Sequence, residues 1–248
     1  YKKLNNYKIN NKSINLINIE YNQNKPFEKI SIKSNNFIEQ SFYIAFNIIK
    51  KYKITKFING PIVKKTFLQK KYPGITEYIS KKFNINKSAM LIYNKNFSVC
   101  PITTHLPLKS VTKKITKKNI FDKTKLINKF YKKNFYKKPK IAILGLNPHC
   151  ESVDKFNEDE KIVKPVIKLL SKQGINVSGP YSADTFFIKN NRKKFDVAIG
   201  MYHDQVLTPL KTLFEYDAIN ITLGLPFIRI SPDHGPNEKM VGKNISNP

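Results

Sequence analysis

The stretch that decides the fold is residues 196–235, DVAIGMYHDQVLTPLKTLFEYDAINITLGLPFIRISPDHG. Two apolar runs within it, residues 197–201 and 218–225, have the length and composition of buried strands. Each run is followed by groups that suit a metal ion or a phosphate: YHDQ at 202–205 after the first, and Arg229 with DHG at 233–235 after the second. In open α/β sheets, ligands bind beyond the carboxyl ends of strands. We therefore expect a binding site where these strands end.

Further apolar runs at residues 89–102 and 140–146 predict more strands. Apolar residues at helical spacing over 38–49 predict an amphipathic helix, and residues 112–140 predict another with a solvated, Lys-rich face. A helix should also follow Asn157 and stop near Gly174. This alternation of strands and helices indicates an α/β fold with several parallel strands.

Shorter signals predict smaller elements. Residues 14–19 alternate weakly, as short strands do, and Phe57-Ile58 suggests a brief strand. PGITE at 73–77 is typical of a loop that starts a helix, and Gly179-Pro180 is typical of a turn. Pro165 is expected to kink or start the helix around it.

The net charge of +28 first suggests nucleic-acid binding. Only Arg192 and Arg229 are arginines, however, and Lys abounds throughout, so we interpret the charge as solvated surface. Cys100 and Cys150 are isolated thiols, and no membrane span or signal peptide is evident, which predicts a cytoplasmic protein. The chain starts at Tyr1, so we expect a fragment or a processed chain.

Three of the four histidines directly follow strand-like runs: His105, His149 and His203. One histidine in such a place is usually structural. Three at the ends of neighbouring strands are able to converge on one divalent cation, with Asp184 or Asp204 as an orienting carboxylate, a ligand or a base. The spacing leaves the structural and the metal-binding interpretations open.

Lys211, Asn220 and Arg229 lie after or within the last strands and together suit a phosphate or carboxylate. No GxGxxG, GxSxG or P-loop sequence is present, so a Rossmann-type nucleotide site is not supported. Cys150 beside His149 lacks a group that orients the pair, which disfavours a nucleophilic thiol.

Six segments in order resemble the 4-hydroxythreonine-4-phosphate dehydrogenase family: TTHLPL (103–108), GLNPH (145–149), GPYSADT (179–185), MYHDQ (201–205), NITLGLPFIR (220–229) and SPDHG (231–235). NGPIVKK (59–65) and PGITE (73–77) are weaker matches. The resemblance implies an isocitrate/isopropylmalate-dehydrogenase-like α/β fold with two lobes around a central cleft. Tentative lobes are residues 1–60 plus 204–248, and 61–203. The family's N-terminal glycine-rich segment and last helix have no match, so we expect a truncated catalytic unit.

The resemblance also implies a homodimer with a site shared across its interface. The implied reaction is NAD- or NADP-dependent oxidation of 4-phosphohydroxy-L-threonine, then decarboxylation to 3-amino-2-oxopropyl phosphate, for pyridoxal phosphate (vitamin B6) synthesis. The implied ligands of a zinc, cobalt or magnesium ion are His105, His149 and His203. The other implied site residues are Asp184 and Lys211 for catalysis, Thr76, Lys211, Asn220 and Arg229 for substrate, and His234, Gly235 and Asn237 for the dinucleotide.

Some positions depart from the family pattern. Ile75 stands where the family usually has His, and Val206 replaces the Gly after HDQ. Ile75 keeps open a family enzyme for another four-carbon acid phosphate, of threonate or erythronate type. A metal-dependent lyase or phosphatase, active without NAD, is a second alternative. A basic nucleic-acid binder, whose DNA affinity falls steeply with salt, is a third.

Overall fold

The computed structural model describes residues 12–25 and 28–245, which form two compact units. The larger unit holds residues 56–61 and 71–234. The smaller unit holds the described residues before 56, residues 62–70 and those from 235 onward. The expected division into lobes near residues 60 and 203 stays a prediction.

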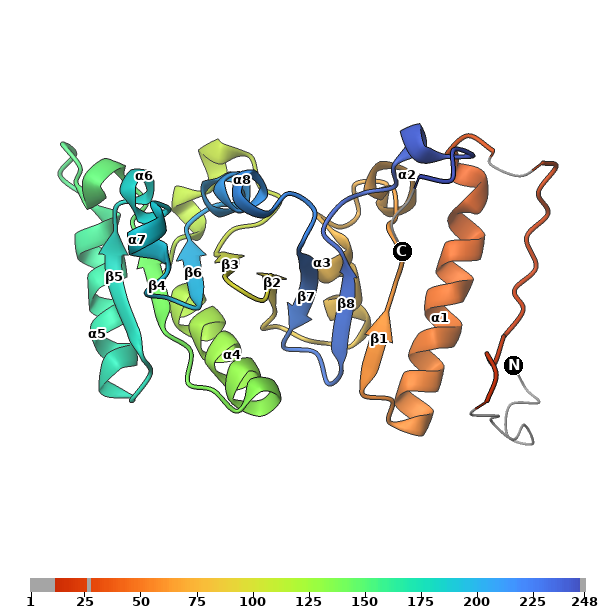
Figure 1. Ribbon diagram of the computed structural model, residues 1–248, viewed down its shortest axis with the longest axis horizontal. Helices are drawn as coiled ribbons and strands as arrows, with labels where there is room; N and C mark the ends of the chain where they lie inside the picture. The colour runs from red at the N-terminus through yellow and green to blue at the C-terminus, as the bar shows by residue number, and fades with distance from the viewer. Residues whose placement is uncertain (1–11, 26–27, 246–248) are drawn as a thin grey trace. The chain divides into compact units, whose positions relative to one another are not determined.

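The larger unit is built on a mixed sheet with the strand order β1-β8-β7-β2-β3-β6-β4-β5, seen from right to left in Figure 1. β3, β6, β4 and β5 are parallel to one another and β1 is parallel to β8, whereas β2 and β7 pair antiparallel with their neighbours. The predicted α/β class is therefore confirmed. The strands are β1 (Lys56–Ile58), β2 (Ala89–Tyr93), β3 (Ser98–Pro101), β4 (Ile141–Leu144), β5 (Val177–Tyr181), β6 (Val197–Gly200), β7 (Ile219–Leu223) and β8 (Ile228–Pro232).

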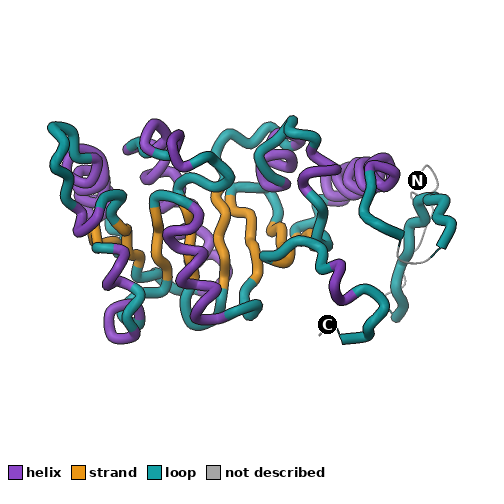
Figure 2. Tube along the Cα trace, turned by 90° about the horizontal axis from the view of Figure 1, so that it is seen from above, coloured by secondary structure: helices purple, strands orange, loops and turns teal. Residues whose placement is uncertain are grey.

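Helices cover both faces of the parallel strands, as Figure 2 shows. In β4, Ile141 and Ile143 pack on one face and Ala142 and Leu144 on the other, because successive side chains of a strand point in opposite directions. All four are buried, which explains the continuous apolar run in the sequence. The helices of this unit are α3 (Ile75–Lys82), α4 (Lys117–Phe135), α5 (Lys164–Lys172), α6 (Ala183–Phe186), α7 (Lys189–Arg192) and α8 (His203–Phe214).

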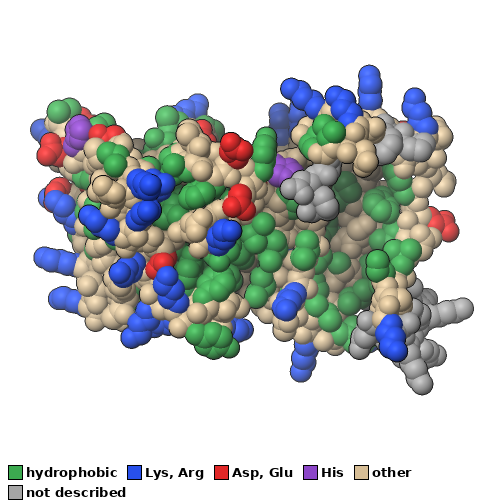
Figure 3. All heavy atoms as spheres, viewed as in Figure 1, with side chains coloured by type: hydrophobic (Ala, Val, Ile, Leu, Met, Phe, Trp, Pro, Cys, Tyr) green, Lys and Arg blue, Asp and Glu red, His purple; other side chains and the backbone are tan. Residues whose placement is uncertain are grey.

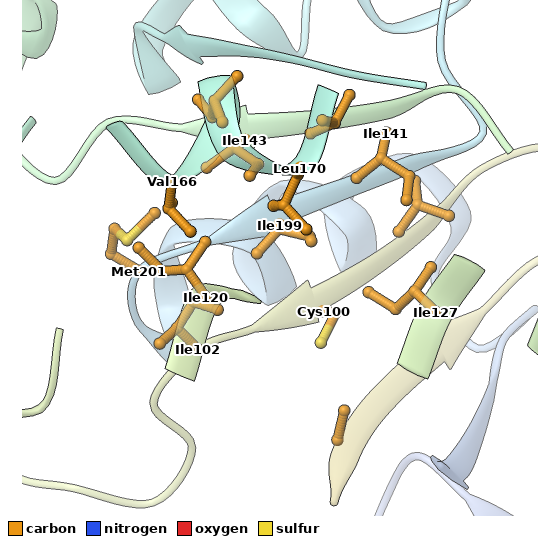
Figure 4. Close-up of a cluster of buried hydrophobic side chains, with 14 of the residues drawn as sticks. Cys100, Ile102, Ile120, Ile127, Ile141, Ile143, Val166, Leu170, Ile199 and Met201 are labelled. Carbon is orange, nitrogen blue, oxygen red and sulfur yellow. The ribbon is translucent and has the colours of Figure 1, made fainter. Parts of the chain in front are cut away.

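α4 and α5 pack on the face that holds Ile141 and Ile143, and α8 packs on the face that holds Ala142 and Leu144. In α4, Ile120, Ile127 and Tyr131 are buried and every lysine except Lys123 is exposed, much as the sequence predicted. Figure 4 shows side chains from α4 and α5 meeting those of the strands. In Figure 3 the basic side chains are scattered among other kinds, which supports the solvated-surface interpretation.

The smaller unit is held by α1 (Asn35–Tyr52), with α2 (Lys64–Leu68) and the short 3-10 turns η2 (Ile32–Ser34) and η7 (Glu238–Met240). The predicted helix is confirmed: Phe42, Phe46 and Ile49 form its buried face. The Phe42 ring lies 5.9 Å from that of Phe67 on α2. The strands predicted for residues 14–19 are wrong: the segment forms no strand, and Ile14 and Leu16 are exposed while Ile17 and Ile19 are half-buried.

Two other expectations meet the structure in different ways. The predicted turn at Gly179-Pro180 is wrong, because both residues lie inside β5. Gly179 has φ +131°, and a Cβ there would lie 2.3 Å from the Ile143 carbonyl oxygen, so the glycine allows β5 to approach β4 closely.

Asn157 does cap the following helix, accepting a hydrogen bond from the Asp159 backbone N–H at 2.9 Å. A π-helical turn, η6 (Asp159–Val163), then leads into α5, with Pro165 in the first turn of α5.

Among the helices of the described residues, none is long and apolar enough to cross a membrane.

Candidate active site

His105 and His203 are brought together by the pairing of β3 with β6. Beyond the parallel strands, the ladder continues through Thr103, whose backbone N–H and hydroxyl both donate to the Met201 carbonyl, at 3.2 and 2.8 Å. The segments that follow β3 and β6 therefore leave the sheet at the same edge, each two residues before its histidine. The two imidazole centroids lie 5.7 Å apart.

His203 is the first residue of α8 and is oriented by its neighbour. Its Nδ1 lies 2.6 Å from Oδ1 of Asp204. The Asp204 side chain is largely exposed and that of His203 about one-third exposed, at 33%. A carboxylate on one ring nitrogen leaves the other for a ligand, which supports the orienting role that the sequence suggested for Asp204.

His149 lies in a different group. It sits in the short turn η5 (Pro148–Cys150) with φ 52°, and its Nδ1 is 3.9 Å from Oδ2 of Asp184. Both side chains are exposed, at 73% and 55%. The Ser182 hydroxyl, and then the Thr185 backbone N–H, lower the pKa of Asp184 by hydrogen bonding, so it is a carboxylate at neutral pH.

Within residues 12–25 and 28–245, no group of three or more His, Cys, Asp or Glu side chains is placed to hold one metal ion. Within one chain, the His105 ring therefore lies near the His203 ring, and the His149 ring lies near the Asp184 carboxylate. The three-histidine metal site stays a prediction.

Asp159 organises the loop that carries His149. This carboxylate is fully buried and accepts hydrogen bonds from the backbone N–H groups of Leu146 (2.7 Å) and Asn147 (3.0 Å) and from the Asn147 amide (3.2 Å). Its partners are backbone groups that precede it by twelve and thirteen residues, and no sequence pattern reveals them.

Gln205 braces two of the site loops. Its amide donates to the Gly145 carbonyl and its carbonyl accepts from the Met201 backbone N–H, both at 2.7 Å. These bonds join the chain after β4, which leads to His149, to the chain after β6, which leads to His203. The sequence marked Gln205 only as part of a polar cluster, so this positioning role was missed.

A second polar group surrounds Arg229, which is 2% exposed. Its Nε donates to Oδ1 of Asn59 at 2.7 Å and its Nη1 to the Thr222 hydroxyl at 3.1 Å. The Thr76 hydroxyl lies 3.3 Å from that of Thr222. Burial lowers the pKa of Arg229 to about 10, against the opposing effect of Glu77, so the guanidinium is charged at neutral pH. None of the ion pairs of the described residues includes Arg229, and a buried charge without a close counter-ion favours an anionic ligand.

The sheet register explains why these residues meet. Thr222 lies opposite Arg229 and Asn220 opposite Ser231, so the four share one face of β7 and β8. Ile221, between Asn220 and Thr222, packs into the core on the other face. Thr222 and Asn59 were missed as site residues, although the alternation of NITL was a usable signal for Thr222. The Asn220 Oδ1 atom is buried and accepts no hydrogen bond.

Lys211 of α8 forms an ion pair with Oδ2 of Asp233, just beyond β8. The Asp233 side chain is 1% exposed, and its Oδ1 is buried and accepts no hydrogen bond. The sequence marked Asp233 only as part of the DHG cluster at 233–235 and gave it no role of its own. It fixes the Lys211 ammonium at this end of the sheet.

Comparison with known proteins identifies the family of this chain. The chain matches, over residues 2–248, the family model described as pyridoxal phosphate biosynthetic protein PdxA. The chain belongs to this family. The predicted resemblance is therefore confirmed.

The relatives within the PdxA family differ in their named substrate. The chain is 46% identical over 195 residues to a 4-hydroxythreonine-4-phosphate dehydrogenase of Sulfurihydrogenibium sp. (strain YO3AOP1), covering 77% of this chain and 60% of the relative. It is 37% identical over 165 residues to a D-threonate 4-phosphate dehydrogenase of Pectobacterium atrosepticum, covering 66% and 51%. The chain thus spans about three fifths or less of the length of these curated relatives.

Solved structures of the PdxA family share the fold. The structure of 4-hydroxythreonine-4-phosphate dehydrogenase from Klebsiella pneumoniae superposes with a TM-score of 0.74 at 29% identity, over 90% of this chain and 69% of that one.

The residues expected near a dinucleotide fall into two units. His234 ends the larger unit, where its ring packs edge-on against Tyr216 at 5.8 Å. Gly235 and Asn237 belong to the smaller unit, in which the Asn237 side chain caps η7 by accepting from the Lys239 N–H at 3.2 Å. Their role in cofactor binding stays a prediction.

Proposed function

We propose that this chain carries the catalytic residues of a 4-hydroxythreonine-4-phosphate dehydrogenase. The reaction is NAD-dependent oxidation of the secondary alcohol of 4-phosphohydroxy-L-threonine, followed by decarboxylation to 3-amino-2-oxopropyl phosphate. The observation that carries the proposal is the His105–His203 pair, at the edge of a sheet that also holds the buried Arg229 group. Membership of the PdxA family supports it.

The donor set fits a divalent cation such as zinc or cobalt. His105 and His203 present two imidazoles, and Asp204 already orients one of them. When bound, such an ion lowers the pKa of the substrate hydroxyl and polarises the carbonyl formed from it. His149 would supply a third imidazole from the second copy of a homodimer, which accounts for its exposure and for its separation from the pair.

The phosphorylated substrate needs cationic and hydrogen-bonding groups. Arg229 is held in place by Asn59 and Thr222, and Lys211 is held by Asp233, so both charges are fixed before substrate arrives. Such fixed charges bind the phosphate, and this remote binding energy orients the carbinol for reaction.

Thr76 and Asn220 complete the substrate contacts, and Asp184, which lies beside His149 and would reach the site with it from the second copy, accepts the hydroxyl proton. The lowered pKa of Asp184 keeps it in the carboxylate form that a proton acceptor needs. NAD would supply the hydride acceptor, and the family resemblance makes His234, Gly235 and Asn237 its expected contacts.

The test is NADH formation with 4-phosphohydroxy-L-threonine, with and without a chelator. His105→Ala and His203→Ala should abolish chelator-sensitive turnover, while Lys168→Ala, on the exposed face of α5, serves as the control. A folded, metal-loaded protein that forms no NADH with this substrate contradicts the proposal. Product formation without NAD would indicate a lyase or a phosphatase instead.

A second candidate substrate is D-threonate 4-phosphate. Ile75, 7% exposed, precedes Thr76 where the family usually has a polar His, and one relative is named for D-threonate 4-phosphate. The ratio of kcat/KM for the two substrates decides between them. A preference for the threonate that Ile75→His reverses would establish the second candidate.

A further inference from the structure

Tyr216 is a largely exposed aromatic residue beside the proposed phosphate site. It is 76% exposed, yet its ring lies against Lys211, one of the two cations proposed to bind phosphate. The Lys211 ammonium lies over the ring, 5.3 Å from its centroid. At this distance an ammonium is attracted to the negative face of an aromatic ring.

The turn that follows α8 places the ring there. The C-cap of α8, Glu215, has φ +50° and ψ −111°, a positive φ that residues with a side chain rarely adopt. The Asp217 backbone N–H donates at 2.8 Å to the carbonyl of the last helical residue, and the Asp217 carboxylate accepts from the buried Asn94 amide at 3.2 Å. The chain therefore folds back at Glu215, which brings the Tyr216 ring over the Lys211 ammonium.

The Tyr216 ring has a second contact, with His234. The two ring centroids lie 5.8 Å apart and the two planes are 89° to one another. Edge-to-face packing of this kind is a preferred arrangement of aromatic rings. Because β7 and β8 lie between the two residues in the chain, the contact ties the turn after α8 to the segment after β8. The ring is therefore held in place although most of it faces solvent.

Asp233 holds the same ammonium through its charge. Its buried carboxylate accepts one hydrogen bond from Lys211, and an ammonium has three hydrogens to donate. The Lys211 side chain is 31% exposed, so part of the ammonium stays open to an anion. A carboxylate positions the ammonium but also repels an incoming anion, whereas a neutral ring positions it without that repulsion.

We propose that Tyr216 is a positioning residue for Lys211. Its ring face keeps the ammonium where the phosphate of the substrate binds and adds no negative charge to the site. The inference rests on the proposed function for the phosphate-binding role of Lys211. It gives the turn after α8 a part in substrate binding.

The experiment compares Tyr216→Phe with Tyr216→Leu. The first change keeps the ring and removes the hydroxyl, whereas the second keeps an apolar side chain and removes the ring. Calorimetric titration with sulfate measures anion binding without turnover. We expect the dissociation constant for sulfate to rise about two- to fivefold in Tyr216→Leu and less than about twofold in Tyr216→Phe. Tyr43→Leu, a matched change at a 64% exposed tyrosine of α1, should leave the constant unchanged.

A graded series separates the charge distribution of the ring from its size. Phenylalanines with increasing numbers of fluorine atoms keep nearly the same shape, but the negative face of the ring weakens with each fluorine. Placed at position 216, they should weaken sulfate binding step by step. KM for the phosphorylated substrate should rise in the same order with kcat little changed, because the ammonium contacts the phosphate both before and during the reaction.

The outcomes separate this inference from the proposed function. Lys211→Ala should weaken sulfate binding more than any change at Tyr216, and Lys168→Ala, on the exposed face of α5, should not weaken it. An unchanged sulfate affinity in Lys211→Ala contradicts the phosphate role in the proposed function. If Lys211→Ala weakens binding but Tyr216→Leu does not, the positioning role of Tyr216 is overturned. Equal weakening in Tyr216→Phe and Tyr216→Leu, or no effect of fluorine, overturns it as well.

Discussion

Replacing Asp159 should destabilise the protein far more than replacing its neighbour Glu160. In the Asp159→Ala variant, the backbone N–H groups of Leu146 and Asn147 lose their acceptor in a buried place. A hydrogen bond to a charged group contributes about 1.5–3 kcal/mol, and each buried donor left unpaired costs about 1–3 kcal/mol. Because these two quantities overlap, we expect a loss of about 3–5 kcal/mol in the free energy of unfolding.

Asp159→Asn keeps one acceptor oxygen and should lose about half as much. The control is Glu160→Gln, because Glu160 forms an exposed ion pair with Lys164, with side chains 48% and 50% exposed. Loss of this exposed ion pair should lower the free energy of unfolding by less than about 1 kcal/mol.

The assay is equilibrium denaturation in urea followed by circular dichroism. The destabilisation by Asp159→Ala should exceed that of Glu160→Gln several-fold. Equal destabilisation by the two variants would refute the reasoning.

Three further predictions concern Gln205, Arg229 and Cys100. Gln205→Ala removes both hydrogen bonds between the site loops and should lower the free energy of unfolding by about 1–3 kcal/mol, measured by denaturation. Steady-state kinetics should show a larger effect on kcat than on KM. An unchanged kcat would contradict the positioning role of Gln205. Because burial lowers the pKa of Arg229 to about 10, affinity for sulfate, whose own charge is constant in this range, should be level from pH 7 to about 9 and fall above it. Arg229→Lys, which lacks the fork, should bind sulfate more weakly at pH 7 in calorimetry. Burial raises the pKa of Cys100 to about 11, so this thiol should resist labelling by iodoacetamide at pH 8 in the folded protein and react once urea unfolds it. Rapid labelling of Cys100 in the native state would contradict its burial.

Much of the fold follows from local pattern. The helical spacing of Phe42, Phe46 and Ile49 predicted α1, and the buried run around Ile143 predicted β4, because these periods report which side chains face a core. The turn predicted at Gly179 was wrong, although a Gly-Pro pair is typical of turns. Its actual role, close approach to the Ile143 carbonyl, depends on a neighbouring strand far away in sequence.

The candidate site was predictable where side chains follow strands. His105 and His203 were identified from that position, and the pairing of β3 with β6 does bring them together. The residues that hold the site were not predictable. Asp159 and Gln205 bond to backbone groups of other loops, and such partners are set only when the sheet is assembled.

The most direct test of the central claim is chelator-sensitive NADH formation from 4-phosphohydroxy-L-threonine by wild type and His203→Ala, with metal content measured on both. We predict that the wild type binds a divalent metal and forms NADH, that a chelator stops this, and that His203→Ala loses both metal and activity while remaining folded. Full activity in His203→Ala, or in a wild type stripped of metal, would contradict the account.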